Sequence, residues 1–254
     1  MSFIEIARED RVLRLTLNRP EKKNALSAEF CTQLADAFDE ANSNSGVGCV
    51  LLEARGDVFC AGMDLSDAIG PDAAQKTAIH ERLFTVASRS LKPIVAAVAG
   101  PALGGGVGLL CNAHIVVAAH GCNFGLTEIR IGMWPFIIWR AVVATIGERR
   151  ATELALTGRI FSVNEAVQWG LVHEVAPAFE LDDRASATAH HLAESAPQAI
   201  RLGLEYLRAS RGLSSDESGR LALQFRTQAF GSEDYREGVT AFQEKRRPVW
   251  PKIL

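Results

Sequence analysis

The chain has 254 residues, of which 48% are hydrophobic and 22% charged, and its formal net charge at pH 7 is −3. This length and composition are typical of a globular protein with one α/β domain, or with one domain and a helical appendage. The slightly negative net charge argues against nucleic acid as the main partner, because phosphate binding requires a basic surface.

In the first half of the chain, short apolar runs alternate with helical patterns. Residues 11–17 alternate as a half-buried strand does, and Ser27 is a suitable N-cap for the helix that follows. The apolar stripe of that helix consists of Phe30, Leu34, Ala37, Phe38 and Ala41. The next predicted elements are a strand at 49–53, a helix over 72–91, a strand at 93–99, a glycine turn with a short helix, and a strand at 114–119.

The second half of the chain is predicted to be mainly helical after Pro135, with one strand at Leu171–Val175. From about residue 181 onward only helical patterns occur, and Pro197 and Gly212 interrupt them. Strands that alternate with helices indicate β/α layering with parallel strands. We therefore expect an α/β core over residues 1–195 and a helical region over residues 196–254.

The cysteines and the charge distribution indicate a cytoplasmic protein. The five cysteines include no C-x-x-C pair and their number is odd, so we expect reduced thiols. The first residues, MSFIEIARED, lack the apolar segment of a signal peptide. Residues 93–127 contain no Asp, Glu, Lys or Arg, but proline, glycines and polar residues interrupt the run, so we expect buried elements and no membrane association.

Two glycine-containing segments are candidates for chemistry, DVFCAGMDL at 57–65 and GPALGGGVGLL at 100–110. Glycines between a buried strand and a helix leave the backbone uncovered, and a helix N-terminus can bind a phosphate or a developing oxyanion. Taken alone, the triplet Gly104–Gly106 is weak evidence, because close helix–strand packing explains it as well. The chain has no phosphate-loop pattern and no dinucleotide motif after its first strand.

Glu128 is the candidate for acid–base chemistry. It ends the long uncharged stretch and precedes an apolar, aromatic run. A carboxylate that is partly desolvated there would have its pKa raised toward a value useful for a general base. From spacing alone, a helix-terminal carboxylate or an ion pair with Arg130 is an equally good interpretation. The six histidines show no metal-binding spacing, so we expect no metal site.

Five segments together resemble the enoyl-CoA hydratase/isomerase (crotonase) family: NRPEKKNALS, FCAGMDL, LKPIVAAVAGPALGGGVGLL, FGLTEIRIG and AFQEKR. They occur in the family's order and span nearly the whole chain, which is far more specific than any one of them. The resemblance implies a crotonase-like core of repeated ββα turns over 1–195. It also implies a C-terminal helical oligomerisation region over 196–254 and a homotrimer or hexamer.

The same resemblance implies roles for single residues. The backbone amides of Met63 and Gly105 would form an oxyanion hole for the carbonyl oxygen of an acyl-CoA thioester, and Glu128 would act as general base and acid. From their apolar character, and not from the resemblance, we expect Trp134, Phe136, Ile137 and Trp139 to belong to the core or to line the acyl pocket. Contacts with coenzyme A are implied for Lys22, Lys23, Ala61, Asp64, Leu65, Phe242 and Lys245. The last two match a helix that often completes the site of a neighbouring subunit. No cofactor is implied, because coenzyme A arrives as part of the substrate.

Two departures from the family's hydratases bear on the reaction. Their second glutamate, in the helix after the glycines, is replaced by Gly108, and their glycine-rich turn after the proline is replaced by residues 136–139, FIIW. Some isomerases place an acid at position 136, where this chain has Phe136. We favour 3-enoyl-CoA to 2-enoyl-CoA isomerisation with Glu128 as the proton shuttle. The alternatives are hydration of 2-enoyl-CoA by Glu128 alone, and acyl-CoA binding without catalysis.

Overall fold

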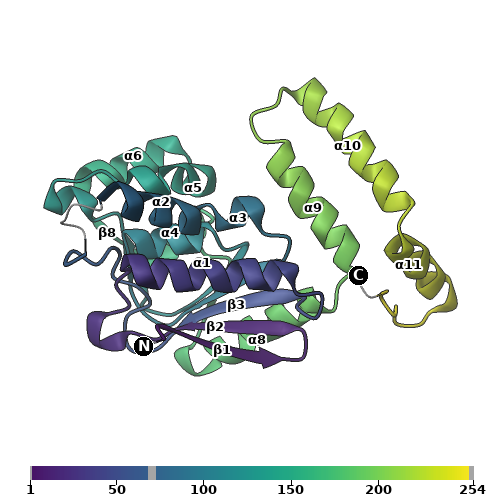
Figure 1. Ribbon diagram of the computed structural model, residues 1–254, viewed down its shortest axis with the longest axis horizontal. Coiled ribbons are helices and arrows are strands. Elements are labelled where there is room, and N and C mark those ends of the chain that lie inside the picture. Colours follow the sequence, from purple (N-terminus) through teal and green to yellow (C-terminus); the bar gives the residue numbers. More distant parts are fainter. Residues whose placement is uncertain (1, 68–72, 252–254) are drawn as a thin grey trace.

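A six-stranded sheet lies at the centre of the fold (Figure 1). The computed structural model describes residues 2–67 and 73–251. The first two strands are antiparallel, and every other neighbouring pair in this sheet is parallel. In spatial order the strands are β1 (Ile4–Glu9), β2 (Val12–Leu17), β3 (Cys49–Ala54), β4 (Ile94–Val98), β6 (Ile115–Ala119) and β9 (Glu174–Ala176). The predicted α/β class is therefore confirmed.

Burial explains why some strands were predicted and one was not. All five residues of β4 are buried, as expected for a central parallel strand that is covered on both faces. Helix α1 (Ala28–Ser43) packs against β1 and β2, and α8 (Leu181–Ala193) packs against β3, β4 and β6. In β1 only Ile4 is buried, so this edge strand has no apolar pattern and was missed.

A second, three-stranded sheet was also missed, because each of its strands has only two or three residues. Its strands are β5 (Ala102–Leu103), β7 (Asn123–Gly125) and β8 (Ile160–Ser162). An isolated bridge joins Cys60 to Ala102, so this sheet links the two glycine-containing segments. The sequence does not indicate this link, because strands of two or three residues are too short to show an alternating pattern of apolar and polar residues.

The helices that surround the candidate site follow directly from their sequence signals. Ser27 caps α1 by accepting a hydrogen bond from the Phe30 amide. The predicted helix over 72–91 is two helices, because the chain leaves helical geometry at Thr85; residue 72 lies outside the described residues. The remaining helices before α8 are α2 (Ala73–Phe84), α3 (Val86–Arg89), α4 (Gly105–Cys111), α5 (Phe136–Ile146), α6 (Glu148–Thr157) and α7 (Val163–Gln168), with 3-10 turns η1 (Pro20–Lys22), η2 (Glu128–Ile131) and η3 (Ala178–Glu180).

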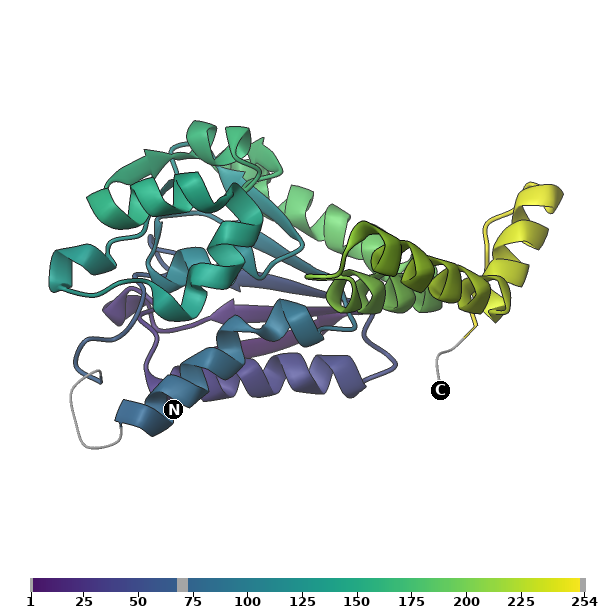
Figure 2. The ribbon, with the colours of Figure 1, turned by 90° about the horizontal axis from the view of Figure 1, so that it is seen from above.

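Three C-terminal helices extend away from the sheets, as Figure 2 shows. They are α9 (Pro197–Ala209), α10 (Ser215–Phe230) and α11 (Glu233–Glu244). Ser214 and Glu217 form a capping box at the start of α10, yet none of the sixteen residues of that helix is buried. Within residues 2–67 and 73–251, no helix has the length and apolar character needed to cross a bilayer.

Candidate active site

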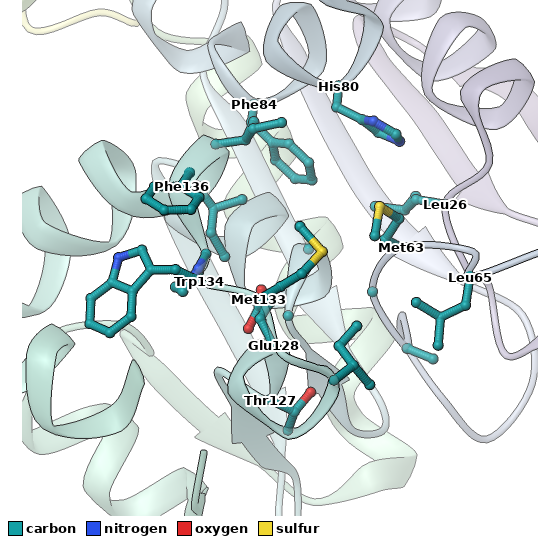
Figure 3. A pocket seen from close by; sticks show the side chains of 18 of the residues that line it. Leu26, Met63, Leu65, His80, Phe84, Thr127, Glu128, Met133, Trp134 and Phe136 are labelled. Atoms are coloured by element: carbon teal, nitrogen blue, oxygen red, sulfur yellow. The ribbon is translucent and has the colours of Figure 1, made fainter. Parts of the chain in front are cut away.

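A pocket of about 370 Å³ lies between α2, the start of α4 and the segment that follows β7 (Figure 3). It brings together segments from five separate parts of the chain. Its lining is mostly apolar, and the ionisable side chains in it are His80 and Glu128. The lining residues are Leu26, Ala61, Gly62, Met63, Leu65, Thr77, His80, Phe84, Gly104, Gly105, Thr127, Glu128, Ile131, Met133, Trp134, Pro135, Phe136, Ile137 and Ile138.

The Met63 amide is presented to the pocket by a short parallel bridge. Leu26 donates its N–H to the Gly62 carbonyl at 2.8 Å, and its own carbonyl accepts from the Asp64 amide at 3.0 Å. These two hydrogen bonds engage the carbonyl of Gly62 and the amide of Asp64, the residues on either side of Met63. Among the described residues, no acceptor pairs with the Met63 N–H itself. This amide is a free donor at the pocket wall.

The Gly105 amide is a second free donor, on the facing segment. Gly105 is the first residue of α4, where a helical N–H has no intrahelical acceptor, and no other described group accepts from it. A Cβ atom on Gly62 would lie 3.4 Å from the Gly105 nitrogen, so the two segments are adjacent. The preceding Gly104 has φ +50°, a conformation that favours glycine.

Close packing explains part of the glycine triplet as well. A Cβ atom on Gly106 would lie 2.5 Å from the Cys60 carbonyl oxygen, so the backbones of the two segments meet here without side chains between them. The close-packing explanation therefore holds for Gly106, and the approach that it permits places the Met63 and Gly105 amides on adjacent segments at the pocket wall.

Glu128 lies directly over this wall. It is the first residue of η2, and a Cβ atom on Gly104 would lie 3.1 Å from its Oε1. Burial raises the pKa of the Glu128 carboxyl, and a hydrogen bond from its own amide partly opposes that rise. Its Oε2 is buried and has no hydrogen-bond partner within the described part of the chain. The ion pair with Arg130 does not form, since Arg130 donates to the Gly158 carbonyl at 2.6 Å.

The residues implied in coenzyme A binding fall into three groups. Ala61 and Leu65 line the pocket beside Met63. Lys22 and Lys23 are exposed in the turn next to this segment, and the Lys23 carbonyl accepts from the Ala61 amide at 3.0 Å. Asp64, which belongs with Ala61 and Leu65 to the group beside Met63, is 8% exposed and is engaged within the chain. Its carboxylate accepts from the Arg19 guanidinium at 2.7 Å and from the Ser66 hydroxyl at 2.6 Å.

The third group lies apart from the pocket of its own chain. Phe242 is on α11 and is 86% exposed, and Lys245 follows at the end of the same helix. Neither residue lines the pocket.

The two aromatic residues predicted for the acyl pocket differ from each other. The indole of Trp134 packs against that of Trp139, with ring centroids 5.1 Å apart. Phe136 is 74% exposed, so the alternative of a core role is wrong for this residue. Both residues line the pocket, and in Figure 3 they lie on the side away from Met63.

Apolar atoms fill the space beside Gly108. A Cβ atom at this position would overlap Ile138 Cγ2 and would lie 2.9 Å from Phe84 Cε1. A glutamate therefore cannot be accommodated at position 108 while Phe84 and Ile138 keep their present places. The space beside position 108 is therefore filled by apolar packing.

Sequence reasoning missed the contribution of α2. Thr77, His80 and Phe84 recur at helical spacing and face the pocket from this helix. The only available signal was this i, i+3, i+7 spacing, which also fits an ordinary core stripe. Nothing in the sequence shows that the stripe meets the glycine segments.

Comparisons with known proteins identify relatives of this chain. The family model described as enoyl-CoA hydratase/isomerase matches residues 7–252. The 1,2-epoxyphenylacetyl-CoA isomerase of Escherichia coli is 33% identical, and the match covers 98% of each chain. The 2,3-dehydroadipyl-CoA hydratase of the same organism is 31% identical, also over 98% of each. A crystal structure of an enoyl-CoA hydratase from Mycobacterium smegmatis superposes on this chain with a TM-score of 0.93. The two chains are 28% identical, and the match covers 98% of this chain and 99% of the other. This similarity confirms the predicted crotonase-like fold.

Proposed function

Because this chain belongs to the enoyl-CoA hydratase/isomerase family, we propose that it isomerises 3-enoyl-CoA thioesters to 2-enoyl-CoA thioesters, with Glu128 as the proton shuttle. Family relatives include proteins named as isomerases and as hydratases, so membership alone leaves the reaction open. The choice rests on one observation. Phe84 and Ile138 fill the space beside Gly108, where a hydratase of this family would place its second carboxylate.

The first step of the proposed reaction is removal of a proton from the α carbon. The carboxylate of Glu128 takes this proton, and the electron pair left behind delocalises onto the thioester oxygen. The amides of Met63 and Gly105, which have no acceptor within the described residues, would donate to that oxygen. Each such donor contributes about 3–4 kcal/mol in comparable sites. A buried carboxyl with a raised pKa is a suitable base for this task.

The second step returns the same proton to the γ carbon. Both carbons can face one carboxylate, so a single group serves as base and then as acid, and the double bond moves without any net change in atoms. Water addition has a further requirement, because an ordered water needs about two to four polar partners. The wall beside Gly108 offers Phe84 and Ile138 instead, and this supports isomerisation over hydration.

The test uses both substrates with the parent protein and with Glu128→Gln, in deuterated water, with products identified by mass and NMR. We expect the parent to isomerise 3-enoyl-CoA faster than it hydrates 2-enoyl-CoA. Glu128→Gln should lower the isomerisation rate by a factor of roughly 10² or more. Fast hydration with slow isomerisation by the parent would select the hydratase alternative. Tight binding of both thioesters without turnover would select the non-catalytic alternative.

A further inference from the structure

His80 is a polar side chain on the α2 wall that the proposed reaction does not use. It lies between Thr77 and Phe84 in the stripe that faces the pocket, and it is 9% exposed. Its Nε2 is buried and has no hydrogen-bond partner among the described residues. Figure 3 shows His80 and Glu128 entering the site from different elements, with Met133 between them in this view.

The imidazole of His80 is neutral at pH 7. Burial lowers its pKa, and the main-chain carbonyls of Leu26 and Lys76 and the charge of Asp67 only partly oppose this effect. Asp67 is itself paired with the Lys76 ammonium at 2.8 Å, and the charge of Lys76 lowers the pKa of His80 further. His80 is therefore a neutral hydrogen-bonding group in this wall.

An unsatisfied polar atom in such a place requires an explanation. Leaving a buried donor or acceptor unpaired costs about 1–3 kcal/mol, and native structures contain few such atoms. Glu128 Oε2 is another of these atoms, and it belongs to the same pocket. Of the side chains that line the pocket near His80, those of Leu26 and Phe84 are apolar and that of Met63 carries only a thioether, whereas Thr77 on the same stripe of α2 carries a hydroxyl.

We propose that His80 is a specificity residue that binds a hydroxyl group on the acyl chain of the substrate. This inference rests on the proposed function only in placing the acyl group in this pocket. A hydroxyl both donates and accepts, so it can pair with neutral imidazole in either tautomer. Because Nε2 is buried in this structure, binding requires the ring to turn about its Cβ–Cγ bond, a torsion that is broad in histidine, and to leave the main-chain carbonyls beside it.

The lining argues against a charged substituent in place of the hydroxyl. No lysine or arginine lines the pocket, and the carboxylate of Glu128 would repel a second anion there. A desolvated charge without a partner is far more costly than a hydroxyl. A wholly apolar acyl chain, in turn, would leave His80 Nε2 unpaired.

Calorimetric binding of three thioesters tests this proposal: butyryl-CoA, 3-hydroxybutyryl-CoA and 4-hydroxybutyryl-CoA. The measurements use the Glu128→Gln background, so that no ligand is turned over. We expect at least one hydroxylated ligand to bind roughly tenfold more tightly than butyryl-CoA. His80→Leu should abolish this preference and leave butyryl-CoA affinity nearly unchanged, whereas His80→Gln should retain part of the preference.

Two controls make the result specific to His80. Met133→Leu changes another lining residue without altering polarity and should keep the preference. His80→Ala repeats the test with a smaller side chain, and circular dichroism establishes that each variant is folded. Equal affinity for all three thioesters in the His80-containing protein would overturn the proposal, as would a preference that survives in His80→Leu and His80→Ala.

The outcome also separates this inference from the proposed function. A hydroxyl preference together with absent isomerisation would contradict the reaction and leave the role of His80 standing. Isomerisation without a hydroxyl preference would contradict the role of His80 alone.

Discussion

At the scale of single residues, Glu128 links catalysis to stability. Its pKa is raised above the ordinary value of 4.5 in the folded protein by burial. The folded state therefore binds the proton more tightly than the unfolded state, and stability falls as pH rises from about 4.5 through the raised value. At pH 7 the buried carboxylate, with an unpaired Oε2, lowers the free energy of unfolding.

Glu128→Gln should therefore be more stable than the parent at pH 7, by roughly 1 kcal/mol, while losing activity. The difference should vanish below pH 4, where both states of the parent are protonated. Urea unfolding at pH 7 and pH 4 measures this, with Glu40→Gln as the exposed control. The acidic limb of the parent's kcat/KM profile should lie above pH 4.5. Equal stability of the two proteins at pH 7 would contradict a desolvated Glu128.

The Gly105 amide offers a matched pair of variants. Gly105→Ala and Gly105→Pro both add a Cβ atom, which meets Phe84 Cζ at 3.1 Å and Leu26 Cδ1 at 3.2 Å. Only proline removes the N–H, and proline is tolerated at the first position of a helix. We expect Gly105→Pro to isomerise roughly 10²-fold more slowly than Gly105→Ala. Similar rates in the two variants would show that Gly105 serves packing alone.

At the scale of elements, a buried ion pair holds the segment that presents Met63. Arg19 and Asp64 have side chains that are 15% and 10% exposed, and Arg19 also donates to the Ala25 carbonyl. The pKa of Asp64 is lowered, because hydrogen bonds from Ser66 and Arg19 outweigh the effect of burial. The charged pair therefore ties the Met63 segment to the turn before α1.

Asp64→Asn should lower the free energy of unfolding by roughly 3 kcal/mol, because it leaves the Arg19 charge unpaired. It should also lower kcat, because the ion pair no longer holds the segment that positions the Met63 amide. Glu5→Gln breaks the exposed pair with Arg55 and serves as the control, with an expected loss below about 1 kcal/mol. Chemical denaturation and steady-state rates measure both effects. An Asp64→Asn protein as stable as Glu5→Gln would contradict this role.

How far the sequence predicts the structure differs between elements. Long buried strands such as β3 and β4 show continuous apolar runs, and the helix that begins after Ser27 shows both its cap and its stripe. The strand predicted at 171–175 lies at Glu174–Ala176, because the residues before it pack in a turn after α7. Exposed β1 and the brief strands of the second sheet have no such signal.

The candidate site was predictable only where a motif marks it. The glycine segments and Glu128 stand out in the sequence, the family resemblance suggests their roles, and the structure brings them to one pocket. The α2 stripe was not found, since its meeting with Gly105 and Gly108 depends on tertiary packing. The same holds for Ile138, whose role becomes visible only through its contact with position 108.

At the scale of the whole molecule, the protomer exposes more surface than a compact chain of its mass. Its accessible surface is 13118 Å², whereas a monomer of 27.5 kDa is expected to expose about 11,000 Å². The C-terminal helices account for part of this excess. Leu207 is 56% exposed, Leu223 is 63% exposed and Phe230 is 47% exposed. This supports the proposal of a trimer or hexamer, with these helices at or near the interface.

Light scattering at micromolar concentration should give three or six times the protomer mass. Leu223→Asp should dissociate the assembly, because it places a charge on the apolar face of α10, whereas the neighbouring exposed Gln224→Glu should not. A stable parent monomer would contradict the prediction.

Subunit mixing tests whether Phe242 serves a neighbouring site. Glu128→Gln lacks the base, and Phe242→Ala should raise KM by roughly tenfold through lost apolar contact with the substrate. If Phe242 acts across the interface, a mixed assembly contains sites with an intact Glu128 and a neighbour's Phe242. Its KM should then approach that of the parent. A mixed assembly whose KM stays as high as that of Phe242→Ala alone would show that Phe242 does not contribute to a neighbouring site.

The packing at Gly108 has an evolutionary consequence. A Glu at this position would overlap Ile138 and crowd Phe84, so Gly108→Glu is expected to be destabilising in the present background. Smaller residues at 84 and 138 would have to come first, and each of those changes alone leaves a cavity. The three positions are therefore epistatic, and their effects should not add. Every single-substitution route from this pocket to a two-glutamate pocket is therefore expected to pass through a less stable intermediate, which makes a second carboxylate hard to acquire.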